Sequence, residues 1–72
     1  MSHTAAARRD VRSSVLALAD RRPSLSRRAV TWTVARKEDV QLEVVQEELD
    51  ALERAGEIYT VGSGETAEVR RT

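Results

Sequence analysis

The sequence predicts an α+β domain in which three helices are followed by a two-stranded β-hairpin. Apolar residues recur at intervals of three and four before Pro23 and again over 42–55, which is typical of helices. Pro23 separates the first helical segment from the second. After Gly56 the apolar spacing falls to about two, which is typical of strands. At 72 residues the chain has room for one domain. We expect that domain to span 7–72, after a disordered N-terminal tail at 1–6.

The first helix is predicted to run from about Ala7 to Asp20. Its apolar stripe follows the i, i+4, i+7 pattern of a helix with one buried face, and is formed by Val11, Val15 and Leu18. Proline disfavours helical geometry in the residue before it, so Pro23 ends this segment. We expect Leu25 to lie in a short extended piece that forms a small extra strand.

The second helix is expected over Arg27–Arg36, with Ser26 as its N-cap. Val30 and Val34 lie one turn apart, and Trp32 is expected to share their buried side. The β-favouring residues of 31–34 leave a strand as the alternative for this segment.

The third helix is the clearest signal and is predicted over Leu42–Ala55. Asp39 or Gln41 is expected to cap its start, and Gly56 to follow its end. Its apolar residues step by three, four and three, and are Leu42, Val45, Leu49 and Leu52. Its opposite face is polar and carries Glu43, Gln46, Glu47, Asp50, Glu53 and Arg54.

The hairpin is predicted from strands at 58–61 and 66–70, joined by a glycine-rich turn at 62–65. A lone two-stranded hairpin is only marginally stable, so we expect it to pack on the helices. Tyr59 in its first strand is predicted to pack in the core, as is Trp32, and stacking on a base or anchoring a partner is the alternative for each.

This order of elements resembles the winged-helix variant of the helix-turn-helix. Val40 resembles the apolar residue that ends the turn, and the sequence Gly56-Glu57-Ile58-Tyr59 resembles the entry into the wing. The chain is similar to the C-terminal winged helix of archaeal minichromosome-maintenance helicases and to small archaeal winged-helix DNA-binding proteins. The resemblance implies a winged-helix fold with a role in transcription or replication, but not helicase activity, because the ATPase motifs are absent.

The composition argues against catalysis and against cofactors. The chain has no cysteine, and its one histidine is His3, in the expected tail, which disfavours a histidine-based triad or a zinc site. The glycines of 62–64 lack the lysine and the following helix of a phosphate-binding loop. No apolar run approaches the roughly 20 residues needed to span a bilayer. We therefore expect a cytoplasmic binding domain that is not an enzyme, with no cofactor, no metal and no membrane partner.

Charge is divided unevenly along a chain whose net charge is zero. Residues 1–37 carry nine basic and two acidic side chains, and 38–72 carry three basic and ten acidic ones. The halves therefore differ as +7 and −7, which is the main indication of a charged partner. The near-exclusive use of arginine over lysine indicates a salt-loving or GC-rich source.

DNA is the first expected partner, because arginines neutralise backbone phosphates. The acidic third helix disfavours the usual insertion into the major groove, so binding is expected through the first two helices and the wing. The candidate nucleic-acid-binding residues are Arg8, Arg12, Arg27, Arg28, Arg36, Lys37, Arg70 and Arg71.

Two alternatives stay open at this point. In one, the domain is a protein-interaction module with no direct DNA contact, which binds a partner through Glu43, Glu47 and Asp50. In the other, the basic and acidic halves of two copies associate head to tail as a homodimer.

Overall fold

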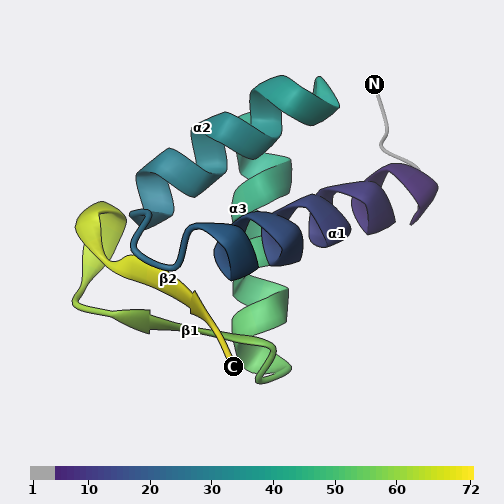
Figure 1. Ribbon diagram of the computed structural model, residues 1–72. Helices are drawn as coiled ribbons and strands as arrows, with labels where there is room; N and C mark the ends of the chain where they lie inside the picture. Colours follow the sequence, from purple (N-terminus) through teal and green to yellow (C-terminus); the bar gives the residue numbers. More distant parts are fainter. Residues whose placement is uncertain (1–4) are drawn as a thin grey trace.

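Three helices precede an antiparallel hairpin in the computed structural model, which describes residues 5–72 (Figure 1). The elements are α1 (Ala5–Arg21), α2 (Arg27–Glu38), α3 (Leu42–Arg54), β1 (Ile58–Val61), the short 3-10 helix η1 (Gly64–Thr66) and β2 (Glu68–Arg71). The α+β class and the order of elements agree with the sequence. Helix α1 begins two residues earlier than predicted, at the end of the expected tail. Residues 1–4 of that tail, His3 among them, lie outside the described residues.

Helix α2 is helical throughout, so the strand alternative for this segment is wrong. Ser26 has the extended backbone of an N-cap, and its hydroxyl accepts a 3.1 Å hydrogen bond from the Ala29 backbone N–H. At the other end, Asp39 adopts a left-handed conformation, and its N–H donates to the Ala35 carbonyl. Asp39 therefore ends α2, and Gln41 occupies the N-cap position of α3 without a side-chain capping bond.

The Ser26 cap gives the first testable prediction. Replacing Ser26 with alanine leaves a backbone N–H of the first turn without its partner, so we expect the free energy of unfolding to fall by about 1 kcal/mol. Thermal unfolding followed by circular dichroism measures this change. The exposed Ser24, two residues earlier, has no side-chain hydrogen bond among residues 5–72, and Ser24→Ala serves as the matched control. Equal effects of the two substitutions would contradict the capping role.

The core lies where the three helices and one face of the hairpin meet. Val45 and Leu49 of α3 are fully buried at its centre, as the three-four-three spacing predicts. Leu42 and Val40 are only partly buried at its margin, and Ala55, the predicted last residue of the third helix, is exposed. The other buried apolar residues are Val11, Val15, Leu18, Ala19, Val30, Val34, Ala35, Val44, Leu52, Ile58, Ala67 and Val69.

The two aromatic residues are the clearest departure from the prediction. Trp32 is 50% exposed and Tyr59 is 45% exposed, so neither packs in the core. On α2 the buried stripe is completed by Thr31 and Ala35 instead. Trp32 is two residues from Val30 and from Val34, and residues at that separation point to different sides of a helix. The expectation that Trp32 shares their buried side is therefore wrong.

The hairpin pairs Ile58 with Arg71 at its open end and Val61 with Glu68 at the turn. Gly62 and Gly64 have positive φ values of 102° and 68°, which glycine adopts without steric cost. Because 64–66 form a 3-10 turn, the second strand begins two residues later than predicted.

The predicted extra strand near Leu25 exists as a single bridge between Ser26 and Glu68. The Val69 N–H donates to the Leu25 carbonyl at 2.9 Å, and the Arg27 N–H donates to the Ala67 carbonyl at 2.7 Å. The link between α1 and α2 is thereby joined to β2.

None of the described helices has the length and apolar character needed to cross a membrane.

Candidate nucleic-acid interface

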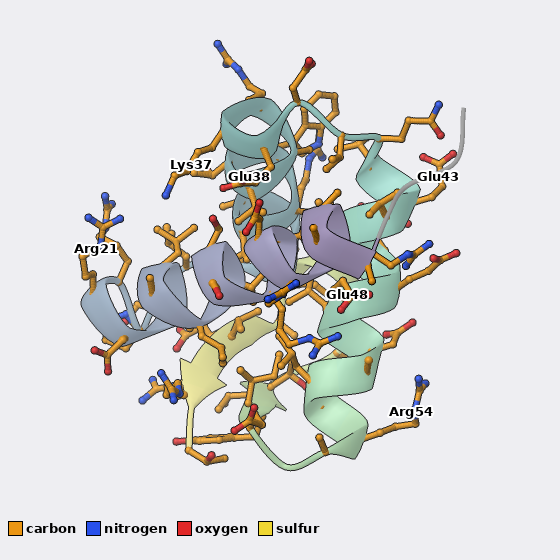
Figure 2. All side chains as sticks on the ribbon, turned by 90° about the vertical axis from the view of Figure 1, so that its right-hand side faces the viewer. Arg21, Lys37, Glu38, Glu43, Glu48 and Arg54 are labelled. Atoms are coloured by element: carbon orange, nitrogen blue, oxygen red, sulfur yellow. The ribbon has the colours of Figure 1, made fainter. Side chains whose placement is uncertain are left out.

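Helices α1 and α3 are joined by a charged cluster around Glu48. This side chain is 7% exposed, and Figure 2 shows it where α1 crosses α3. Arg8 Nη1 lies 3.2 Å from Glu48 Oε2, and Arg12 donates from Nε and Nη2 to Glu48 Oε1, both at 3.2 Å. Arg8 also reaches Glu47 at 2.9 Å. Hydrogen bonds to Glu47 and then to Glu48 raise the pKa of Arg8, so Arg8 stays a charged partner of α3.

Arg27 makes the corresponding contact between α2 and α3. Its guanidinium is paired with Asp50 and lies 3.7 Å from Glu53. Only 20% of the Arg27 side chain is exposed, and its backbone N–H is bonded to Ala67. Three of the eight candidate phosphate-binding residues are therefore engaged with carboxylates of α3.

The same contacts reduce the free acidic surface of α3. Glu47 is held by Arg8 and Asp50 by Arg27. Of the three residues that were candidates for binding a basic partner, Glu43 alone has no ion pair among residues 5–72. Part of the opposite charge of the two halves of the chain is thus neutralised by ion pairs between them.

Arg70 and Arg71 lie beside the end of α1. They line a shallow surface depression with Asp20, Pro23 and Tyr59. Arg70 is paired with Glu68 at 2.7 Å, and this hydrogen bond raises its pKa. This depression shares no lining residue with the one that contains Arg28 and Arg36 of α2.

The exposed side of α2 carries the remaining candidates. Arg28, Trp32 and Arg36 follow one another at single-turn spacing, and with Thr33 they line a shallow depression, which we call the α2 surface. Lys37 follows Arg36 in the last turn of the helix and does not line this depression. Among residues 5–72, no carboxylate forms an ion pair with Arg28, Arg36 or Lys37. These cations are therefore free to meet an anionic ligand.

Comparison with known proteins does not assign the chain to a group. No family model, no curated protein and no solved structure matches it. In the part of the chain that the structure describes, no three or more His, Cys, Asp or Glu side chains gather as a metal site. A function for this chain therefore has to follow from the chemistry of the α2 surface itself.

Glu48 and Trp32 differ from what was predicted at these sites, and the sequence holds a signal for each of them. Glu48 was not among the expected residues, yet it lies in the apolar stripe of α3, three residues after Val45 and four before Leu52. A carboxylate in that position needs a buried partner, and the arginines of α1 were the available ones. For Trp32 the signal is its separation of two residues from Val30 and from Val34, which directs it to a different side of the helix from these two valines.

Proposed function

We propose that the chain is a small winged-helix domain that binds nucleic acid through the α2 surface, and that it is a binding domain and not an enzyme. The observation that carries this proposal is a half-exposed tryptophan with an arginine one turn before it and another one turn after it, neither of which forms an ion pair within 5–72. Arginines supply the phosphate contacts, and an exposed indole supplies a stacking surface for bases. The acidic face of α3 argues against insertion of that helix into a major groove, where phosphates would repel it.

Fewer basic residues are available to bind nucleic acid than the sequence predicted. Arg28, Arg36 and Lys37 remain its phosphate ligands, whereas Arg8, Arg12 and Arg27 are held by α3. Arg70 and Arg71 belong to a separate surface at the end of α1. The three remaining cations make a small site, so we expect modest affinity with strong dependence on salt.

The test is a charge reversal on the α2 surface. Arg28→Glu with Arg36→Glu is expected to weaken binding of a fluorescein-labelled DNA about 100-fold at low salt, from about 1.4 kcal/mol for each charged hydrogen bond. Fluorescence anisotropy measures the affinity over a series of salt concentrations. The slope of log affinity against log salt is expected to become shallower by about 1.4 if the labelled DNA is single-stranded and by about 1.8 if it is a duplex, the values for two lost phosphate contacts.

Arg22→Glu with Arg54→Glu is the matched control, because it changes the net charge equally. Both arginines are exposed and have no ion pair among residues 5–72. Figure 2 shows Arg54 at the opposite end of the molecule from Lys37 on α2. If this control weakened binding as much as the α2 variant, the proposal would be wrong, because binding would then follow net charge alone.

A protein-interaction module with no direct DNA contact is the second candidate. Tryptophan and arginine are the residues that most often dominate protein interfaces, and the α2 surface consists largely of them. Absence of binding to any nucleic acid at low salt would exclude the first candidate and leave this one.

A further inference from the structure

A groove runs between α2 and α3 on the other side of Trp32. It is open to solvent and has a volume of about 280 Å³. Arg28, Thr31 and Trp32 line it from α2, and Leu42 and Gln46 line it from α3, while Glu65 contributes from the turn of the hairpin. Arg28 and Trp32 line both this groove and the depression that contains Arg36.

The chemistry of the groove suits a flat, polar-edged ring. The Trp32 indole and the partly buried Leu42 side chain provide apolar surfaces. Gln46 is the one uncharged polar residue on a face where Glu43, Glu47 and Asp50 are acidic. Its amide both donates and accepts hydrogen bonds, which matches the edge of a nucleobase and carries no charge to repel phosphate.

We infer that this groove holds one unpaired nucleobase stacked on Trp32, so that the ligand of the α2 surface is single-stranded nucleic acid. The inference rests on the proposed function and names its substrate class. Arg28 and Arg36 are eight residues apart on α2, which at 1.5 Å per residue is about 12 Å, a span that reaches the phosphates on both sides of a stacked base. In a duplex the face of each base is covered by its neighbours, whereas in a single strand it is free to stack on an indole.

Trp32 is the only tryptophan in the chain, so its fluorescence reports directly on the site. The probes are a single-stranded DNA of about 12 nucleotides, the same strand annealed to its complement, and an RNA of the same sequence. We expect both single strands to quench Trp32 and to bind at least about tenfold more tightly than the duplex. Preference for one single strand over the other assigns DNA or RNA as the ligand.

Variants of Trp32 test the stacking contact. Trp32→Ala is expected to weaken single-strand binding by roughly 10- to 100-fold, the range for one lost base stack, with a much smaller effect on the duplex. Trp32→Phe keeps an aromatic face and is expected to restore most of the affinity. Tyr59→Ala removes the other exposed aromatic side chain, which lies on β1 and does not line the groove, and is the matched control. Anisotropy of the labelled strands measures these variants, and circular dichroism verifies that each one folds.

The outcomes separate this inference from the proposed function. Equal affinity for duplex and single strand, unchanged in Trp32→Ala but lost in the Arg28 and Arg36 double variant, overturns the base groove and leaves nucleic-acid binding intact. Failure of every nucleic acid to bind at low salt overturns both. Loss of the single-strand preference in Trp32→Ala, with its return in Trp32→Phe, supports the inference.

Discussion

Leu49→Ala is expected to lower the free energy of unfolding by about 3 kcal/mol, the middle of the range for a buried leucine replaced by alanine. Leu49 is fully buried in α3, the helix that packs against both α1 and α2. A domain of this size has a total stability of only about 4 to 10 kcal/mol, so the variant should lose a large part of it. Urea unfolding followed by circular dichroism measures the change.

Val61→Ala is the control for this prediction. Val61 is apolar too, but it is 49% exposed on β1, so its truncation is expected to change stability by about 0.5 kcal/mol or less. If Leu49→Ala were as mild as Val61→Ala, the assignment of α3 as the centre of the core would be wrong.

The second large effect is expected for Glu48→Lys. The substitution puts a buried cation beside Arg8 and Arg12 and removes the carboxylate that both arginines bind. A buried charge that loses its partner costs about 3 kcal/mol or more, and here the new charge also repels its neighbours. The expected result is a variant that is largely unfolded, or that unfolds at much lower urea concentration than the parent.

Glu47→Lys separates burial from charge in this experiment. Glu47 is the adjacent residue and binds the same Arg8, but its side chain is 62% exposed. An exposed ion pair contributes about 1 kcal/mol or less, so this variant should remain folded with nearly the stability of the parent. Similar losses in the two variants would show that net charge, and not the buried carboxylate, holds α1 against α3.

Local signals in the sequence were sufficient to predict most of the architecture. The spacing of Leu42, Val45, Leu49 and Leu52 identified α3 within one residue at its end, and Ser26 marked the start of α2. The change of apolar spacing after Gly56 located β1 at its observed position. These features depend on residues that are close in the sequence, so they can be recognised without knowing the packing.

The candidate site was harder to predict, because it depends on which helices cross. The basic residues of the first half were expected to meet an external anion, yet Arg8, Arg12 and Arg27 lie against α3 and meet its carboxylates. Nothing local to either helix specifies that crossing. Arg28 and Arg36 were among the expected binding residues. The exposed Trp32 between them was expected in the core, because tryptophan is highly buried on average in proteins.

The backbone hydrogen bond from Val69 to Leu25 also restricts the motions of the hairpin. A two-stranded hairpin held only by its own turn opens and closes independently of the rest of a protein. Here the second strand is bonded on its other edge to the segment between α1 and α2, and Val69 is fully buried. Separating the hairpin therefore requires this segment to detach as well, so we expect local fraying to be suppressed and the whole chain to lose its structure as one cooperative unit.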